Sequence, residues 1–464
     1  MKHFKLIVIV AIAILTSCSS DSDETSVVSD PFVIAFEETS AKILEVSETT
    51  EVGLVYSKTV SAEGEISIQI TTENAVYGKD FITIPAADEN RITLDVLSGQ
   101  SSNSFQVVEL NNAFTEAMVI VFSITNITLD GGAIQGNTSF ELSDTLYLGG
   151  EFSPTVGGAN QPNQVYVNLS SNKESVVARD TWDLGFYGDD DFRVVINGSL
   201  YMATAPLETT DINSVTSESV TSLQAVVAVA TFDPTNAAYI DAPNGSVLET
   251  AISEISVEDA NNPVYLVNLG HEIGTTVPNI GSVAVAGDAR GWKKIRILRN
   301  GDDYVLQYAD LDATSFNEVI ISKDADYNFT FFSFNTETIV DVEPKKEEWD
   351  VSFNVFTNVL DGAGTYGFSD FVVHNRKGGV TAYGLDGIAI TYDAFEFANI
   401  EENLLNESQE VIGSNWRDVF AGTVVADIFY ILKDANDNYY KIRFLDLVNA
   451  DGERGNPRFE YLLL

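Results

Sequence analysis

The chain is poor in the residues that support most metal and acid–base chemistry. Its 464 residues include one cysteine, three histidines and three methionines. A single cysteine cannot form an intramolecular disulfide, so the folded state depends on packing alone. Because His3 lies in the leader described below, only His271 and His374 remain for chemistry. This excludes a metal site built on several histidines and argues against a Ser/His/Asp triad, so we expect a protein without enzymatic activity.

Positive charge is also scarce. The 25 Lys and Arg residues face 69 Asp and Glu residues, which gives a formal net charge of −44. A surface this acidic repels phosphate backbones, so nucleic acid is excluded as a partner. It also disfavours attachment to anionic lipid through basic patches. The hydrophobic content of 45% is nevertheless ample for packed cores, and the length predicts two or three domains.

The start of the chain predicts export and lipid attachment. The apolar run from Leu6 to Leu15 is too short to cross roughly 30 Å of hydrocarbon, so residues 1–17 are expected to form a secretory signal. The small residues before Cys18 resemble the lipobox of bacterial lipoproteins, in which this cysteine is lipidated. The acidic Ser/Asp tether over 18–30 resembles the surface-export signal of Bacteroidetes lipoproteins. Together they imply a lipid-anchored outer-membrane protein at the cell surface; the alternative is an ordinary signal peptide with an incidental cysteine.

Residues 31–145 are expected to form a β-sandwich. Runs such as Glu65–Ile70 and Phe81–Ile84 alternate apolar and polar residues with a period of two. This pattern is typical of strands with one buried face. Within the region, Ala75–Phe81 resembles the Gly-x-Asp-Tyr corner of the Calx-β family, so the expected fold is a Calx-β-like sandwich.

The Calx-β resemblance implies a weak calcium site formed by Asp80 and Glu116. Calcium prefers several charged oxygens. However, Asn111 and Asn112 stand where the family usually has paired aspartates. The alternative is a spacer sandwich that binds no calcium.

Residues 146–464 contain an internal duplication, with copies at about 146–325 and 326–464. Each copy has two strands followed by a Trp-Asp-x-x-Phe motif, and residues 294–311 then parallel residues 429–447 as a hairpin. Two copies predict two β-layers that pack face to face around one core. Helices are expected to be few, and Phe395–Gln409 is the best candidate. The motif residues are Trp182, Asp183 and Phe186 in the first copy and Trp349, Asp350 and Phe353 in the second.

We expect the repeated motif to be structural. Trp182 and Phe186 would lie on the same face of an extended strand. Asp183 would then point to the opposite face, where its carboxylate accepts backbone donors at a strand entry. A buried tryptophan also needs a partner for its indole N–H.

The same segments resemble the HmuY family. Val165–Ser171, Trp182–Phe186 and Arg193–Ser199 are similar to its strand, its Trp-Asp-x-x-Phe motif and its Arg and Asn-Gly segment, and Tyr439–Phe444 resembles its C-terminal strands. Members are surface haem-binding lipoproteins of Bacteroidetes. The resemblance therefore implies an almost all-β module that captures haem or a related porphyrin for iron acquisition and passes it to an outer-membrane receptor.

The HmuY resemblance also implies axial ligands of the His or Met type, which suit a buried haem iron. The candidates in this chain are His374, Met202 and His271, and Arg376 and Lys377 are candidates for binding the propionates. Each histidine has an ordinary alternative as a surface or hydrogen-bonded residue, and Met202 as a core filler. Two other functions stay open: an adhesion or scaffold lipoprotein of the same fold without haem, and a glycan-binding surface lipoprotein.

Overall fold

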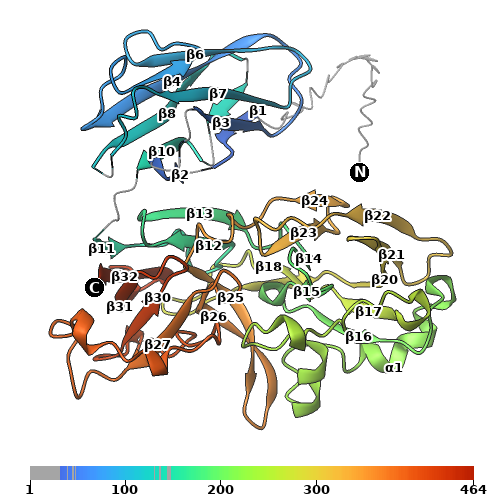
Figure 1. The fold of residues 1–464 in the computed structure, drawn as a ribbon. Helices are drawn as coiled ribbons and strands as arrows, with labels where there is room; N and C mark the ends of the chain where they lie inside the picture. The colour runs from blue at the N-terminus through green and yellow to red at the C-terminus, as the bar shows by residue number, and fades with distance from the viewer. Residues whose placement is uncertain are drawn as a thin grey trace, which may run out of the picture.

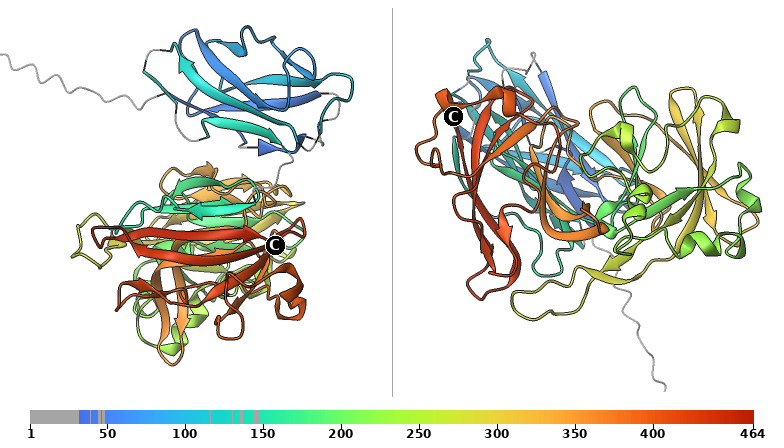
Figure 2. Two further views of the ribbon diagram at one scale, coloured as in Figure 1. Left: turned by 90° about the vertical axis from the view of Figure 1, so that its left-hand side faces the viewer. Right: turned by 90° about the horizontal axis from the view of Figure 1, so that it is seen from below.

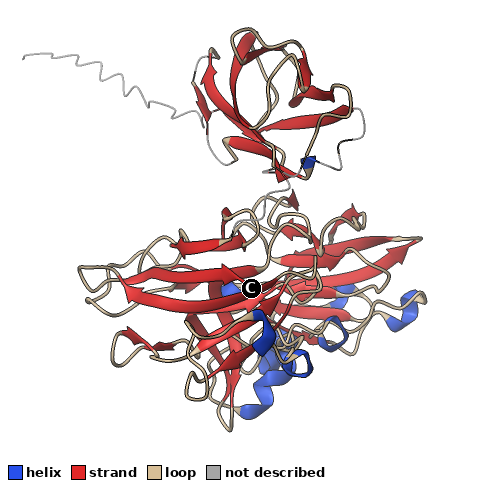
Figure 3. Ribbon diagram, turned by 60° about the vertical axis from the view of Figure 1, so that its left-hand side comes forward, coloured by secondary structure: helices blue, strands red, loops and turns tan. Residues whose placement is uncertain are grey.

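The computed structural model describes residues 32–464, apart from 39, 44–45, 47–48, 116, 130, 135–136 and 144–147. Within these residues the protein is almost entirely β-structure, arranged as an N-terminal sandwich beside a larger two-lobed unit (Figure 1 and Figure 3). The mainly β fold class is therefore confirmed. Cys18, the tether over 18–30 and Glu116 lie outside the described residues.

The N-terminal sandwich consists of two five-stranded sheets. Alternate side chains such as Ile66, Ile68 and Ile70 are buried between them, because successive residues of a strand point to opposite faces. The β-sandwich predicted for residues 31–145 is confirmed. In sheet order its strands are β5 (Phe81–Ile84), β7 (Ser102–Glu109), β3 (Thr49–Tyr56), β1 (Phe32–Phe36) and β9 (Gly132–Ile134), then β2 (Ser40–Ala41), β10 (Ser139–Ser143), β8 (Val119–Ile127), β4 (Gly64–Glu73) and β6 (Arg91–Val96).

The first lobe packs a four-stranded sheet against a five-stranded sheet. Its core contains Leu184, Phe186, Ile295, Tyr304 and Phe332. In sheet order its strands are β15 (Val194–Ile196), β14 (Leu184–Tyr187), β23 (Phe329–Ser333) and β24 (Thr338–Val340), then β16 (Ala203–Pro206), β17 (Val264–Asn268), β20 (Trp292–Asn300), β21 (Asp303–Asp310) and β22 (Asn317–Ile321).

The second lobe has the same construction and its own core, which contains Val165, Phe353, Trp416, Tyr440 and Phe459. Seen from below, the green-yellow first lobe and the orange-red second lobe lie side by side (Figure 2). In sheet order its strands are β13 (Lys173–Ala178), β12 (Asn163–Asn168), β25 (Val351–Leu360) and β26 (Gly364–His374), then β11 (Gly149–Phe152), β32 (Arg454–Leu463), β31 (Tyr439–Val448), β30 (Phe429–Lys433) and β27 (Thr381–Leu385).

The two repeats exchange their opening hairpins. Strand β12 of the first repeat pairs with β25 of the second, with Val165 beside Phe353. In return, β23 of the second repeat pairs with β14 of the first, with Phe332 beside Leu184. The chain thus crosses between the lobes over residues 179–183 and again over 341–350. The expectation of one shared core is wrong, because each exchanged hairpin completes the sheet and the core of the other lobe.

The sheet order also corrects the predicted match between the later hairpins. Strands β17, β20 and β21 take the places in the first lobe that β30, β31 and β32 take in the second. Lys294 of β20 therefore corresponds to Lys441 of β31. The match of residues 294–311 with 429–447 is one strand out of step, because both stretches are hairpins of similar composition.

The helix predicted over Phe395–Gln409 is wrong. That segment contains only two 3-10 turns. The Phe395 carbonyl accepts a hydrogen bond from Lys441 Nζ at 2.9 Å, a contact made in an irregular loop. Among the described residues the one α-helix is α1 (Thr221–Gln224). The remaining short elements are η2 (Gly198–Leu200), η3 (Ile212–Ser214), η4 (Glu218–Val220), η5 (Pro234–Tyr239), η6 (Val247–Glu249), η7 (Asp259–Asn261), η8 (Phe397–Asn399), η9 (Glu402–Leu404), β18 (His271–Ile273), β19 (Ala286–Ala289), β28 (Arg417–Asp418) and β29 (Thr423–Val424).

Candidate functional site

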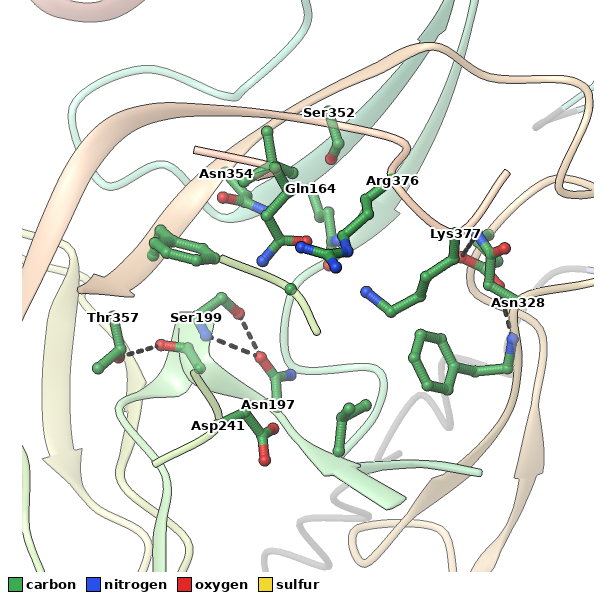
Figure 4. Close-up of a pocket in the computed structure, with 18 of the residues that line it drawn as sticks. Gln164, Asn197, Ser199, Asp241, Asn328, Ser352, Asn354, Thr357, Arg376 and Lys377 are labelled. Carbon is green, nitrogen blue, oxygen red and sulfur yellow. Dashed lines mark hydrogen bonds between the residues drawn. The ribbon is translucent and has the colours of Figure 1, made fainter. Parts of the chain in front are cut away.

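A cavity of about 160 Å³ lies where the exchanged hairpins meet between the lobes (Figure 4). Both lobes contribute to its wall, Met202 and Asp241 from the first and Ser352 and His374 from the second. The motif tryptophans Trp182 and Trp349 also line it, although they belong to different repeats. The cavity is therefore a product of the duplication, since neither repeat alone contains it.

Aromatic pairs related by the duplication form part of the wall. Trp182 meets the ring of Phe331 edge-on, with ring centroids 4.9 Å apart. Trp349 meets Tyr166 in the same way at 5.0 Å. These residues form one hydrophobic cluster that is separate from the cores of the two lobes. The repeated tryptophan thus shapes the inter-lobe space and does not pack inside a lobe.

The expectation that Trp182 and Phe186 share one face of a strand is wrong. Strand β14 begins only at Leu184, after the crossover. Trp182 stays in the inter-lobe cluster, whereas Phe186 packs on Tyr304 in the core of the first lobe, with ring centroids 5.1 Å apart. The motif therefore turns the chain from the interface into a lobe.

The motif aspartates fasten the exchanged strands. Asp183 Oδ2 accepts the backbone N–H of Phe334 at 2.6 Å, and Asp350 Oδ2 accepts that of Leu169 at 2.7 Å. Phe334 and Leu169 directly follow β23 and β12, the exchanged strands. Each aspartate thus binds the other repeat. Arg290 also forms a 2.7 Å ion pair with Asp183, and both side chains are buried.

Two asparagines hold the turns behind the tryptophans. Asn197 Nδ2 donates to the carbonyl oxygens of Arg179 and Trp182 at 2.7 and 2.8 Å. Asn375 Nδ2 donates to those of Lys346 and Trp349 at 2.7 and 3.0 Å. Both asparagines also line the cavity. The sequence signal for this role was the asparagine that recurs after the motif in each repeat.

His374 is the candidate ligand that the structure places most clearly in the cavity. It ends β26 and is 1% exposed. Among the described residues no partner meets hydrogen-bond geometry with either ring nitrogen. Burial lowers the pKa of His374 to about 4. The nearby Glu407 carbonyl opposes this shift, and the charges of Arg376 and Lys377 add to it by smaller amounts. The imidazole is therefore neutral near pH 7.

The other two candidate haem ligands, Met202 and His271, differ in whether they line the cavity. Met202 follows η2 and is fully buried, and it lines the same cavity as His374 but from the first lobe. His271 lies in β18 and is outside the cavity lining. Its Nδ1 lies 3.1 Å from the Gly287 carbonyl oxygen. The structure therefore brings together one histidine and one methionine, and it leaves His271 apart.

A charged cluster lines part of the cavity: Asp241, Glu343, Arg376 and Lys377. Of these four, only the two cations belong to the site predicted from the sequence. Burial raises the pKa of Asp241 to about 6 and that of Glu343 to about 7. Burial lowers the pKa of Lys377 to about 8. Nothing in the sequence singled out the two acids, because acidic residues are abundant throughout the chain.

Several buried polar atoms of the wall have no hydrogen-bond partner among the described residues. Beside the ring nitrogens of His374, these are Trp349 Nε1, Ser352 Oγ and Asn354 Oδ1. A buried polar group without a hydrogen bond costs about 1–3 kcal/mol, so such groups are normally satisfied by protein, water or ligand. Their convergence on one cavity is the mark of a binding site.

The predicted calcium site has only one described member. Asp80 is buried, its Oδ2 accepts the backbone N–H of Val76 at 2.9 Å, and its Oδ1 lies 3.2 Å from Lys79 Nζ. Over the described residues there is no group of three or more His, Cys, Asp or Glu side chains placed to hold a metal ion. Calcium binding stays a prediction.

The fold and the cavity define a duplicated all-β protein with a ligand-type site between its repeats. The model of the HmuY protein family matches residues 160–310 and 325–461, which together exceed half of the sequence. The chain belongs to the HmuY family, and the two matched segments agree with the duplication. Membership supports, at the level of the family, a surface protein of the haem-binding type.

Similarity to solved structures is slight. The apo form of the Calx CBD1 domain is 15% identical, with a TM-score of 0.21, and the match covers 25% of this chain and 97% of that domain. A candidate carbohydrate binding protein from Bacteroides ovatus is 8% identical, with a TM-score of 0.17, over 74% of this chain and 97% of that one. These likenesses carry no argument about function. No curated protein matches the sequence.

The membrane question has one structural finding. Across the part of the chain that the structure describes, no helix has the length and apolar character needed to span a bilayer.

Proposed function

We propose that this protein is a non-enzymatic surface lipoprotein, anchored to the outer membrane through Cys18, that binds haem or a related porphyrin for iron acquisition. Membership of the HmuY family supports the ligand class. The cavity between the lobes is the binding site in this proposal, with His374 and Met202 as iron ligands from opposite lobes. The lipobox-like leader supports the anchor.

The observation that carries the proposal is the state of His374. A neutral imidazole is the form in which histidine binds a metal, through a ring nitrogen that is not already hydrogen-bonded. It is held at the end of a strand, in a cavity that also contains a thioether and aromatic walls. Histidine and methionine are ligands found for haem iron, and methionine raises its reduction potential. The donor set thus fits a haem.

The cavity is too small to hold a porphyrin unless the lobes or loops around it move. Pockets that enclose organic ligands usually measure roughly 300–1,000 Å³, and this cavity measures about 160 Å³. The lobes are linked at this cavity by contacts between residues 240–246 and residues 406–410, here named the loop bridge. The Gln409 backbone N–H donates to the Asn244 carbonyl at 3.1 Å, and Gln409 Nε2 donates to the Pro243 carbonyl at 3.0 Å. Porphyrin entry, and release to an outer-membrane receptor, would open this bridge.

The test is a haemin titration of the full chain in detergent, followed by absorbance in oxidised and reduced states. A saturable one-to-one shift of the Soret band with low-spin features is expected. His374→Ala and Met202→Ala should each change or abolish these bands. His271→Ala is the matched control, because it removes a histidine outside the cavity. A non-saturating spectrum that is unaltered by the two cavity variants would sink the proposal.

One observation favours a second candidate, glycan binding. A cavity of about 160 Å³ with tryptophan walls and side-chain amides such as Gln164 and Asn354 suits a sugar-sized ligand. Retention on insoluble polysaccharide without any porphyrin dependence would support it. Absence of both activities, with binding to a protein partner instead, would favour the adhesion or scaffold function.

A further inference from the structure

We propose that Lys377 is the anchor for a ligand carboxylate, and that the cavity selects flat apolar molecules that carry one. This proposal rests on the proposed function, because both place the ligand in the same cavity. It adds the chemical feature of the ligand that the protein recognises. The shared chemistry covers both a porphyrin with its propionates and a smaller aromatic acid.

The contacts of the Lys377 ammonium differ from those of other lysines in the protein. Within the described residues no acceptor oxygen lies at bonding distance from Lys377 Nζ, and its one contact of note is the Phe329 ring, 5.4 Å from Nζ to the ring centroid. Lys377 is half-buried, whereas two fully buried lysines both have close acceptors. Lys294 Nζ donates to two backbone carbonyls at 2.7 and 2.8 Å, and Lys441 Nζ to two at 2.8 and 2.9 Å.

The neighbouring carboxylates of Asp241 and Glu343 accept hydrogen bonds from backbone N–H groups. Asp241 accepts backbone N–H groups from Ile196 and Ala251 at 2.8 and 2.9 Å. Glu343 accepts that of Phe329 at 2.8 Å. Neither forms an ion pair with Lys377 in the part of the chain that the structure describes. Lys377 is half-buried and lines the cavity. An ammonium without a directly bonded anion is free to form a charge-assisted hydrogen bond, so a carboxylate from the ligand supplies that partner.

The charges around Lys377 permit such a partner. Arg376, which donates to the Asn244 carbonyl at 3.2 Å, adds a second cation beside the cavity. Burial raises the pKa values of Asp241 and Glu343 to about 6 and about 7, so part of their negative charge is absent near neutral pH. Figure 4 shows Lys377 and Arg376 extending toward the middle of the cavity.

Aromatic side chains form another part of the cavity wall. Trp182 and Trp349, each with an aromatic partner, offer surfaces for a flat ring system. A volume of about 160 Å³ corresponds to roughly five water molecules at ~30 Å³ each. The closed cavity therefore admits one or two fused rings, whereas a porphyrin enters only when the loop bridge opens. Trp349 Nε1 and Ser352 Oγ provide further unpartnered groups.

The experiment measures binding to the full chain in detergent by calorimetry, using pairs of probes that differ only in the carboxylate. One pair is naphthoate and naphthamide; the other is metal-free protoporphyrin and its dimethyl ester. The acids are expected to bind about tenfold more tightly than their neutral forms, as one charge-assisted hydrogen bond would give. Lys377→Met should abolish this preference, and Lys377→Arg should retain it. Lys293→Met, which removes a lysine outside the cavity, is the matched control.

The outcomes separate the two proposals. Four results would each overturn the carboxylate anchor. These are equal affinity for acid and neutral probes, a preference for the acids that survives in Lys377→Met, binding of a neutral monosaccharide in place of the probes, and no binding of any probe. Because the probes contain no iron, these results do not depend on His374. Haemin binding through His374 with no carboxylate preference would leave the proposed function standing and this inference refuted. Carboxylate-dependent naphthoate binding without haemin binding would support the Lys377 anchor and refute the proposed haem-binding function. Circular dichroism of each variant checks that it is folded.

Discussion

Asp183 accepts the backbone N–H of Phe334 at 2.6 Å, so the aspartate of one repeat fastens the strand of the other. The second repeat returns the contact from Asp350 to Leu169 at 2.7 Å. The Trp-Asp motif therefore does two things at each crossover. Its aspartate locks the exchanged hairpin, and its tryptophan turns into the space between the lobes.

The two aspartates differ in what surrounds them, so their removal should differ in cost. Asp183→Ala removes the 2.7 Å ion-pair partner of the buried Arg290 and leaves Glu272, whose carboxylate is 3.8 Å away. We expect a loss of about 3 kcal/mol in the free energy of unfolding, the lower end of the cost of breaking a buried ion pair. Asp350→Ala leaves the Leu169 N–H unpaired, and we expect a loss of about 1–3 kcal/mol. Urea unfolding of both variants checks the order.

An exposed acid provides the control for that comparison. Asp310 forms a surface ion pair with Lys293, and Asp310→Ala should change the unfolding free energy by less than about 1 kcal/mol. A double variant, Asp183→Ala with Arg290→Ala, should recover part of the loss because it also removes the uncompensated charge. Equal losses in the two motif variants would contradict the role given to Arg290.

The repeats suggest a substitution that separates binding from stability. Strand β15 ends at Ile196 before Asn197, and β26 ends at His374 before Asn375. His374→Ile thus copies the first repeat into the second. Because it removes buried ring nitrogens that lack partners, it should raise the free energy of unfolding by about 1–2 kcal/mol, while the haemin Soret shift is lost.

Both readouts are needed for His374→Ile. Thermal unfolding without ligand gives the stability, and a haemin titration gives the binding. A destabilised variant would mean that the imidazole has a structural partner, and a variant that binds haemin as before would remove His374 from the site. His271→Ala again serves as the control, since its ring lies in β18 away from the cavity.

The sequence was sufficient for much of the fold and for part of the site. Period-two alternation identifies strands wherever one face is buried, and the repeated motif revealed the duplication, because both are local patterns. His374 and Met202 were identified separately, each from its position after a motif. That they line one cavity depends on the packing of the two lobes, which no local pattern encodes.

The exchange of hairpins was not predictable for a related reason. Strand β12 presents its edge to β25 of the other repeat, and the similar sequence of β14 offers a comparable edge within its own repeat. Strand pairing is set by crossover length and tertiary packing more than by propensity. The false helix at Phe395–Gln409 has a related origin, because this loop is held by tertiary contacts such as the bond from Lys441 to the Phe395 carbonyl.

Buried acids predict how stability depends on pH. Burial raises the pKa values of Asp350, Glu343 and Glu348 to about 7, against roughly 4 in an unfolded chain. Between these values the folded state binds more protons than the unfolded state, so stability falls as pH rises toward 7.5. Asp241, with a pKa raised to about 6, acts in the same direction. The lowered pKa of His374 makes stability rise with pH below about 6.5, but it is one group against four acids.

Glu343→Gln isolates one of these groups. The amide oxygen still accepts the Phe329 N–H but does not ionise, so the variant should exceed the parent in unfolding free energy at pH 7.5. The expected gain is about 1–3 kcal/mol, since one pKa unit corresponds to about 1.4 kcal/mol. At pH 5 the two proteins should be nearly equal. Thermal unfolding at both pH values provides the measurement, and a difference that does not change with pH would contradict it.

The loop bridge predicts a kinetic effect on ligand entry. The Gln409 side chain donates to the Pro243 carbonyl at 3.0 Å and so ties the lobes over the cavity. Gln409→Ala removes that bond, which contributes about 1 kcal/mol, and leaves the backbone bond from Gln409 to Asn244 in place. If opening limits entry, the association rate of haemin should rise about fivefold. Stopped-flow absorbance measures the rate, with Gln307→Ala, a glutamine paired with Glu318 outside the cavity lining, as the control. An unchanged rate would mean that porphyrin enters by another route.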